Sequence, residues 1–465
     1  MVRIFRHYVP TPLLFLGVAE AALLFLSMYA GVLLRFIDAD EFGLALVGPV
    51  WPRALVFTFV MMSIFTALGL YQRELPESDW GYYVRFLVSF LLGFIIMSLV
   101  FYAVPPLFLG RGAFALSLLV AAVGTVTARL LFLKWVDYDA IKRRILVLGT
   151  GTRAARIYAL EKSTTARHRF TVVGYLPLKG QHHFVDKNKV LNESGPLLAT
   201  ARRHAVDEIV VGVRDRRNGG LPMEEILECK LNGVAVVDLS SFFERETGHV
   251  QLDSLNTSWI IFSDGFFQGS IKTITKRAFD IGISGLLLVL AAPVMLLTML
   301  AIKLESRGPL LYRQERVGQD GRVFDVLKFR RMTVDAERDG VPKWAQKNDA
   351  RVTRVGRIIR GLRIDELPQI FNVFKGDMSF VGPRPERPFF VNDLSKQIAY
   401  YACRHTVKPG ITGWAQVRYP YGSSLEDAVE KLQYDLYYVK NHSLFLDLII
   451  LFQTMQVVIS GKGAR

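Results

Sequence analysis

The sequence has little cysteine and little charge for its length. Of its 465 residues only two are cysteines, Cys229 and Cys403, which excludes a disulfide framework and a metal site of the Cys-x-x-Cys type. Charged residues make up 21% of the chain and hydrophobic residues 51%. This composition is too apolar for an ordinary cytosolic enzyme and too charged for a pure channel or transporter. At about 150 residues per domain, the length predicts about three structural units.

Acidic residues are also scarce. There are 42 Asp and Glu against 57 Lys and Arg, a net charge of +15. From Ser270 onward we count 30 basic and 19 acidic residues, so this segment carries +11 of that charge. The sequence contains no RNP, KH or zinc motif, which argues against a nucleic acid as the partner. The basic segment is better explained by a lipid bilayer and phosphate-bearing ligands.

Long apolar runs are concentrated in the first third of the chain. Each is long enough to cross a bilayer as a helix, and they are Pro12–Phe36, Leu46–Tyr71, Tyr82–Val104 and Gly112–Trp135. Basic residues at both ends of this region predict that both ends lie in the cytoplasm, which indicates a multi-pass protein of the cytoplasmic (inner) membrane. Glu20 is the only ionisable residue deep in a run. The cations, Arg129 among them, lie near the ends, where snorkelling to the membrane surface is expected.

The middle of the chain has an α/β pattern. A short apolar strand ends in Gly149-Thr150-Gly151, which approximates a dinucleotide-binding fingerprint. However, the next strand ends at Leu176-Pro177 without the carboxylate that usually binds the ribose. Two Tyr-x-x-x-Lys pairs, Tyr158 with Lys162 and Tyr175 with Lys179, are poorly placed for dehydrogenase chemistry. We therefore predict a Rossmann-like structural or regulatory domain with no cofactor-binding residues, and an NAD enzyme is the alternative.

A fifth apolar run, Ile281–Ile302, has basic residues on both flanks and Pro293 at its centre. Both flanks favour the cytoplasmic side, and a central proline interrupts a helix. The 12 residues before the proline reach about 18 Å, roughly the bilayer midplane. We expect a broken, re-entrant helix, and a plain transmembrane crossing is the alternative.

The segment after this run contains several dense motifs. Singly, each has an ordinary explanation: an Asp-Glu pair often caps a helix, and a run of arginines is usually a solvated surface. Together they resemble the bacterial sugar transferase family of monotopic polyprenyl-phosphate phosphoglycosyl transferases over Ile271–Gly461. The motifs are Lys276-Arg277-Ala278-Phe279-Asp280, Lys328-Phe329-Arg330-Arg331-Met332, Asp365-Glu366-Leu367-Pro368-Gln369, Val381-Gly382-Pro383-Arg384-Pro385 and Pro409-Gly410-Ile411-Thr412-Gly413.

Two further comparisons refine the resemblance. Ser258-Trp259-Ile260-Ile261-Phe262-Ser263 resembles the exopolysaccharide branch linked to exosortase systems. The family often has Ser-Pro at the helix break, whereas this chain has Ala292-Pro293, so the kink is kept without the hydroxyl.

The resemblance implies transfer of a sugar-1-phosphate from a UDP-sugar to a polyprenyl phosphate, with release of UMP. It makes Asp365 the nucleophile and Glu366 the leading candidate to hold Mg²⁺, with Asp377 as a further candidate ligand or simply a turn residue. Arg360 and Arg384 match family positions for phosphate binding. Lys328 and Arg330, which alternate with Phe329 on one face of an extended segment, are further candidates. Lys276, Arg277, Asp280 and Pro293 belong to the re-entrant helix.

The resulting architecture has three parts. It comprises a four-helix transmembrane bundle over residues 1–137, a Rossmann-like α/β domain over 138–265, and a mainly α catalytic domain over 266–465 with the re-entrant helix at 278–304. The large form of the family also suggests a homodimer. Besides the NAD-dependent epimerase or dehydratase, a non-enzymatic scaffold for polysaccharide assembly is an alternative, in which Asp365-Glu366 only caps a helix. The sugar is not indicated by any short motif.

Overall fold

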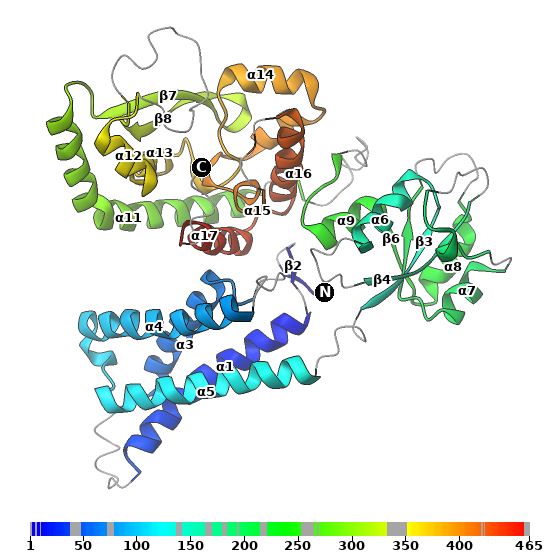
Figure 1. Ribbon diagram of the computed structural model, residues 1–465, viewed down its shortest axis with the longest axis horizontal. Helices are drawn as coiled ribbons and strands as arrows, with labels where there is room; N and C mark the ends of the chain where they lie inside the picture. Colours follow the sequence, from blue (N-terminus) through cyan, green and yellow to red (C-terminus); the bar gives the residue numbers. More distant parts are fainter. Residues whose placement is uncertain are drawn as a thin grey trace. The chain divides into compact units, whose positions relative to one another are not determined.

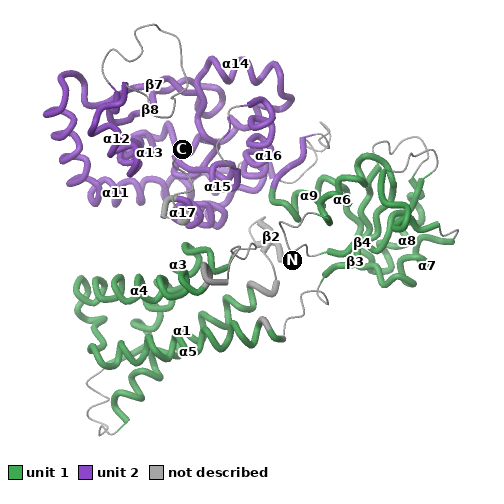
Figure 2. Tube along the Cα trace, in the orientation of Figure 1, with its two compact units in different colours: residues 1–4, 8–248 green, residues 5–7, 249–465 purple. Residues whose placement is uncertain are grey.

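The structure is a computed structural model of the chain. It describes residues 2–4, 7–9, 11–37, 48–71, 79–135, 142–162, 170–178, 184–192, 195–213, 221–252, 265–266, 269–332, 351–419, 422 and 424–459. The chain divides into two compact units, residues 1–4 with 8–248 and residues 5–7 with 249–465 (Figure 2). The predicted exosortase-type stretch 258–263 and Lys179 lie outside the described residues. The three-part division stays a prediction.

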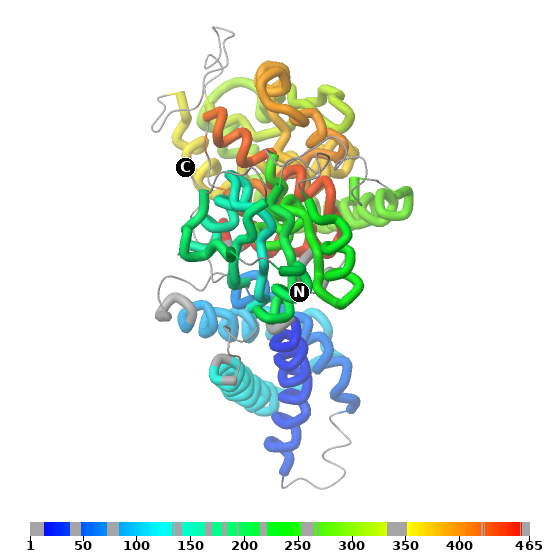
Figure 3. The backbone as a smooth tube through the Cα atoms, turned by 90° about the vertical axis from the view of Figure 1, so that its right-hand side faces the viewer, coloured from blue at the N-terminus to red at the C-terminus, as the bar shows by residue number. Residues whose placement is uncertain are grey.

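Four apolar helices occupy the amino-terminal part of the first unit (Figures 1 and 3). They are α1 (Thr11–Arg35), α3 (Trp51–Ala67), α4 (Asp79–Ala103) and α5 (Arg111–Trp135). Two short strands, β1 (Val2–Ile4) and β2 (His7–Val9), precede them, and the 3-10 turn η1 (Pro105–Leu107) follows α4. Their shared interior is filled by residues such as Leu24, Met28, Phe57, Phe65 and Phe114, while many other large apolar side chains face outward. An apolar exterior around an apolar core is typical of helices in lipid.

Three of the four predicted spans are long and apolar enough to cross a membrane: Leu14–Arg35, Tyr83–Ala103 and Arg111–Phe132. The remaining one is shorter than predicted. Within the described part of the predicted run, residues 48–71, the helix covers Trp51–Ala67, which has 17 residues. Pro52 favours a helix start in the first turn, and Gly69, with φ 73°, follows the last turn. A fourth candidate span, Ser270–Glu305, lies in the second unit.

A buried ion pair joins α1 to α5. Glu20 is fully buried and accepts hydrogen bonds from Arg129 Nε, from Arg129 Nη2 at 2.9 Å and from the hydroxyl of Tyr71. The guanidinium of Arg129 also lies 5.5–5.7 Å from the ring centroids of Phe65, Tyr71 and Phe86. The expected snorkelling of Arg129 is therefore wrong, because its side chain turns inward to neutralise Glu20.

We predict that Arg129→Met destabilises the bundle by about 3–5 kcal/mol, because it leaves a buried carboxylate without its counter-charge. The double variant Glu20→Gln/Arg129→Met removes both charges and should recover most of that loss. Thermal unfolding in detergent measures both. A double variant as unstable as the single one would show that the pair is not the source of the effect.

The rest of the first unit is a parallel sheet in the order β4-β3-β5-β6. Its elements are β3 (Arg143–Leu148), α6 (Thr152–Lys162), β4 (Phe170–Leu176), η2 (Lys187–Lys189), α7 (Leu197–Arg203), β5 (Glu208–Val211), α8 (Met223–Leu231), β6 (Ala235–Asp238) and α9 (Leu239–Thr247). Because side chains alternate along β3, Ile145 and Val147 pack toward α6 and α9, and Leu146 and Leu148 toward α7 and α8 (Figure 1). The predicted α/β fold is thus confirmed.

Two features predicted for this domain are visible in detail. The turn after β3 is made by Gly149, whose φ of 111° suits glycine. The ammonium of Lys162 lies 4.5 Å from the ring centroid of Tyr158, one helical turn earlier on α6. This cation–π contact is a sufficient structural reason for that Tyr-x-x-x-Lys pair.

The first long helix of the second unit is α11 (Ser270–Glu305). It continues with β7 (Leu311–Val317), η4 (Gln319–Gly321), β8 (Val323–Phe329), α12 (Arg354–Gly361), η5 (Ile364–Glu366), α13 (Gln369–Lys375), β9 (Ser379–Val381), α14 (Pro388–Gln397), η6 (Tyr401–Thr406), β10 (Gly410–Thr412), α15 (Trp414–Arg418), α16 (Leu425–Asn441) and α17 (Leu444–Ile459). Strands β7 and β8 form an antiparallel hairpin, and β9 pairs with β10 in parallel. The core contains Trp414, Tyr437 and Tyr438, each at most 2% exposed, so these aromatics are core residues rather than membrane anchors.

Helix α11 is unusual in its length and its exposed apolar surface. Its 36 residues include Pro293, and Figure 1 shows the helix changing direction along its course. A proline removes a backbone donor and is the usual cause of such a bend. The side chains of Leu286, Val289, Leu290, Leu296, Leu297 and Leu300 are each more than half exposed. Such a row of exposed apolar residues is typical of a surface that contacts lipid or another protein.

Candidate active site

The adjacent acids Asp365 and Glu366 lie in η5, the short turn between α12 and α13. Thr353 caps the start of α12, and its hydroxyl accepts a hydrogen bond from the Gly356 amide. The turn itself requires Arg363 in the left-handed region, with φ 56°, which is uncommon for a residue other than glycine. The residue that precedes α13 is Pro368, without a side-chain cap. The acids therefore do not cap α13, and the simple capping explanation is not supported.

The two acids have different environments. Asp365 is 3% exposed, and its Oδ2 lies 3.5 Å from Arg331 Nη1. Burial raises the pKa of Asp365, the charge of Glu366 raises it further, and the cations Arg331 and Lys328 only partly offset this. Glu366 Oε1 accepts a 3.3 Å hydrogen bond from Lys328 Nζ.

Cations dominate the surroundings of Glu366. Burial alone would raise its pKa, but Lys328, Arg384 and Arg363 outweigh burial and hold the pKa of Glu366 below its ordinary value. Burial in turn lowers the pKa of Lys328, an effect that Glu366 opposes and Arg384 reinforces. Two neighbouring carboxyls with pKa values shifted in opposite directions are typical of acid–base or nucleophilic sites.

Arg384 reaches the site from the loop after β9. Its Nη1 donates to Gln416 Oε1 at 3.1 Å, and its charge acts on both Glu366 and Lys328. The structure thus brings together Lys328, Asp365, Glu366 and Arg384. It adds Arg331, Arg363 and Gln416, which the sequence analysis did not single out.

Two predicted phosphate-binding residues have other surroundings. Arg330 follows the last residue of β8, and its side chain has different partners from that of Lys328. The buried Arg330 guanidinium donates to the carbonyls of Ser306 and Arg307 at 2.8–2.9 Å, just beyond the end of α11. Arg360 lies in the last turn of α12, and among the described residues it makes no hydrogen bond or ion pair with Asp365.

Helix α11 is bonded to three other elements through its motif Lys276-Arg277-Ala278-Phe279-Asp280. Lys276 Nζ contacts Asp447 Oδ2 of α17 at 2.6 Å. Arg277 donates two 2.7 Å hydrogen bonds to the carbonyls of Val373 and Phe374 in the last turn of α13, where a cation is favoured. Asp280 Oδ1 accepts from Ser379 Oγ at 3.0 Å and from the Phe380 amide at 3.3 Å. The motif therefore holds the long helix against the elements that carry the site.

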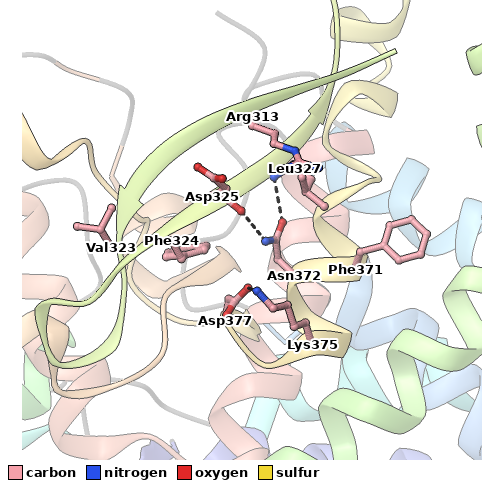
Figure 4. A pocket seen from close by; sticks show the side chains of 9 residues that line it. All are labelled: Arg313, Val323, Phe324, Asp325, Leu327, Phe371, Asn372, Lys375 and Asp377. Carbon is pink, nitrogen blue, oxygen red and sulfur yellow. Dashed lines mark hydrogen bonds and ion pairs between the residues drawn. The ribbon is translucent and has the colours of Figure 1, made fainter. Parts of the chain in front are cut away.

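Asp377 lies in a separate pocket. It lines a cavity of about 380 Å³ together with Arg313, Asp325, Asn372, Lys375 and four apolar residues (Figure 4). Its Oδ2 is 3.0 Å from Lys375 Nζ. Asn372 bridges this pocket to β8 by accepting from the Leu327 amide and donating to the Asp325 carbonyl. Neither Asp365 nor Glu366 lines this cavity.

Comparison with known proteins assigns the part of the chain that contains this site to a protein family. A model of the family described as bacterial sugar transferase matches residues 271–461. A UDP-glucose:undecaprenyl-phosphate glucose-1-phosphate transferase of Caulobacter vibrioides is 44% identical over 193 residues, which are 41% of this chain and 72% of that protein. The chain belongs to the bacterial sugar transferase family.

Some relatives match a longer part of this chain than the family model does. The chain is 40% identical over 291 residues (63% of it and 66% of the relative) to a UDP-N-acetylgalactosamine-undecaprenyl-phosphate N-acetylgalactosaminephosphotransferase of Aeromonas hydrophila. It is 44% identical over 339 residues (70% and 60%) to an undecaprenyl-phosphate glucose phosphotransferase of Komagataeibacter xylinus. The chain thus spans about three fifths to two thirds of the length of these relatives. The family segment begins one residue into α11 and includes every element of the site.

The acids of this sugar transferase site also suit a magnesium ion. Among the residues that the structure describes, no group of three or more His, Cys, Asp or Glu side chains is arranged for a metal. Mg²⁺, however, often takes only one or two protein carboxylates and completes its shell with water and substrate phosphates. Asp365 and Glu366 provide adjacent oxygen donors, and the lowered pKa of Glu366 favours its ionised form. This donor set fits a magnesium ion that binds together with a diphosphate.

Proposed function

We propose that the protein transfers a sugar-1-phosphate from a UDP-sugar to a polyprenyl phosphate and releases UMP. The observation that carries the proposal is the buried Asp365 beside Glu366, with Lys328, Arg331 and Arg384 around them. The names of the relatives support the same reaction class, because they are glucose or N-acetylgalactosamine phosphotransferases that act on undecaprenyl phosphate.

In the proposed reaction, a carboxylate oxygen of Asp365 attacks the phosphorus that bears the sugar. A new oxygen–phosphorus bond forms, the pyrophosphate bond breaks, and UMP leaves with the bonding electrons. An oxygen of the polyprenyl phosphate then attacks the same phosphorus, which forms the lipid pyrophosphate and restores Asp365. Both changes occur at phosphorus, so the configuration of the sugar at its anomeric carbon is kept.

In this scheme the cations offset the negative charge of the carboxylates and the diphosphate. A carboxylate and a diphosphate repel each other, and positive groups placed beforehand lower the energy of the crowded negative transition state. Arg331 faces Asp365, and Lys328 faces Glu366. Arg384 is suited to bidentate contacts with phosphate oxygens. Bound Mg²⁺, held by Glu366 with Asp365 alongside, would further neutralise the diphosphate.

We also propose that α11 enters and leaves the membrane on the cytoplasmic side. Its exposed apolar residues, its central Pro293 and the basic residues on both of its flanks support a re-entrant helix. This placement keeps the site at the headgroup level of the inner membrane, where a lipid phosphate and a cytosolic nucleotide sugar meet. Both soluble regions would then lie in the cytoplasm. The homodimer stays a prediction.

The test is a UMP-release assay with polyprenyl phosphate, Mg²⁺ and a panel of UDP-sugars. We expect UMP release that requires the lipid phosphate for turnover and favours one sugar of the panel. No UMP release with any donor would overturn the proposal. An absorption spectrum of the purified protein tests the NAD-dependent alternative, because a tightly bound dinucleotide would absorb in the near ultraviolet.

The raised pKa of Asp365 predicts the pH dependence of the reaction. The ionised carboxylate is the nucleophile, so kcat/KM should fall as the pH drops through the raised pKa. Arg331 lowers that pKa, and Arg331→Met should therefore move the acid limb to higher pH. Rates between about pH 5 and 9 measure the shift. An acid limb that stays in place would mean that Asp365 is not the group that titrates.

A further inference from the structure

A buried ion pair contacts the loop that carries Arg384. Arg404 in η6 is 6% exposed and Asp435 in α16 is 2% exposed, and their Nη2 and Oδ2 atoms are 2.8 Å apart. Arg404 Nη1 also donates to the hydroxyl of Tyr401 at 2.7 Å. Taking two charges out of water costs free energy that their attraction often fails to recover. Stability alone is therefore a weak reason for such a pair.

The same guanidinium reaches the catalytic loop. Arg404 Nη2 donates to the backbone carbonyl of Arg384 at 2.9 Å. Arg384 is the residue of this loop whose side-chain charge acts on Glu366 and Lys328. Arg404 therefore binds the backbone of the residue that acts on the site. The ion pair with Asp435 and the bond from Tyr401 leave the Arg404 guanidinium little freedom to move.

The neighbouring loop residues are held as well. The Gly382 amide donates to the Thr412 carbonyl at 2.9 Å, and the Pro383 carbonyl accepts from the Gly410 amide at 3.0 Å. Arg316 Nη1 donates to the Pro385 carbonyl at 2.9 Å. Thus every residue from 382 to 385 has a backbone hydrogen bond, and the bond at Arg384 comes from Arg404. These bonds restrict the backbone of the loop and therefore the position of the Arg384 side chain.

We infer that Arg404, held by Asp435, is a positioning residue that sets the place of the Arg384 guanidinium in the active site. Arg404 itself contacts neither acid of the site among the described residues. This inference rests on the proposed function, since the role of Arg384 is to bind the phosphates of the substrate. Displacing a group that binds substrate by about 1 Å costs on the order of 100-fold in rate.

The test is a double-mutant cycle between Arg404→Lys and Arg384→Ala. Lysine keeps the positive charge beside Asp435 but lacks the planar guanidinium fork whose Nη1 reaches Tyr401 and whose Nη2 reaches Asp435 and the Arg384 carbonyl. We expect Arg404→Lys to lower kcat by about 10–100-fold with a smaller effect on KM. In the Arg384→Ala background, Arg404→Lys should lower kcat by less than about threefold, because the Arg384 guanidinium that Arg404 positions is already absent. Equal losses in both backgrounds would overturn the inference and indicate a merely structural role.

Two further variants make the test decisive. Arg245→Lys, in the ion pair with the buried Glu208 of the α/β domain, is the matched control and should leave the transfer rate nearly unchanged. If Arg404→Lys does not fold, Asp435→Asn takes its place in the cycle, because it keeps the side-chain volume and an acceptor oxygen while removing the charge. If the wild-type protein is inactive, the proposed function fails. If it is active and the cycle is additive, only this inference fails.

Discussion

Asp365→Asn is expected to lower the rate of transfer by at least about 10³-fold while the protein stays folded. The amide has nearly the same shape as the carboxylate but cannot act as a nucleophile toward phosphorus. Arg331, its ion-pair partner, is about one-third exposed, so water can solvate the guanidinium after the charge is lost. UMP release with the preferred UDP-sugar measures the loss, and the melting temperature reports on folding.

The matched control for this experiment is Asp393→Asn. Asp393 lies on α14 and its hydrogen bond to Gln397 is exposed, so the same chemical change there should have little effect. Activity of Asp365→Asn within about tenfold of the wild type would contradict a covalent role and leave Glu366 as the more important acid.

Arg384→Ala is expected to lower kcat/KM by about 10²–10³-fold, the usual cost of removing one group that stabilises charge in a transition state. It should also raise the pKa of Glu366, because Arg384 is one of the cations that hold this pKa down. Steady-state kinetics with varied UDP-sugar separate binding from turnover.

An arginine elsewhere in the same unit provides the comparison for Arg384. Arg322 is exposed in the turn between β7 and β8, and Arg322→Ala removes the same positive charge away from the two acids. We expect it to keep nearly full activity. Equal losses in both variants would show that the general positive field of the domain, rather than the position of Arg384, is what matters.

The sequence was sufficient to predict those features that depend on local pattern. Apolar runs predicted the membrane helices, and the strand–glycine–helix pattern predicted the parallel sheet. The Asp365-Glu366 pair stood out because the two acids lie within an arginine-rich, motif-dense stretch. In the structure the two acids lie near Lys328 and Arg384, although these residues lie far apart in the sequence.

Features that depend on tertiary contacts were missed. Arg330 was expected near the phosphates with Lys328, but its guanidinium binds the carbonyls of Ser306 and Arg307, and Arg331 rather than Arg330 reaches Asp365. Position near a span end suggested that Arg129 faces the membrane surface, but Glu20 on another helix draws it inward. The apolar helix α17 was not anticipated, and its buried Asp447 is paired with Lys276 of α11 and with the Tyr438 hydroxyl of α16. A single sequence carries no signal for such partners.

The covalent intermediate itself tests the account most directly. The protein is mixed with the preferred UDP-sugar and Mg²⁺ in the absence of polyprenyl phosphate, and its intact mass and the released UMP are measured. We predict one equivalent of UMP and a mass increase of one sugar-phosphate group on the wild type, located at Asp365, with neither on Asp365→Asn. UMP release that occurs only when the lipid phosphate is present, with no adduct on the protein at any time, would contradict the account.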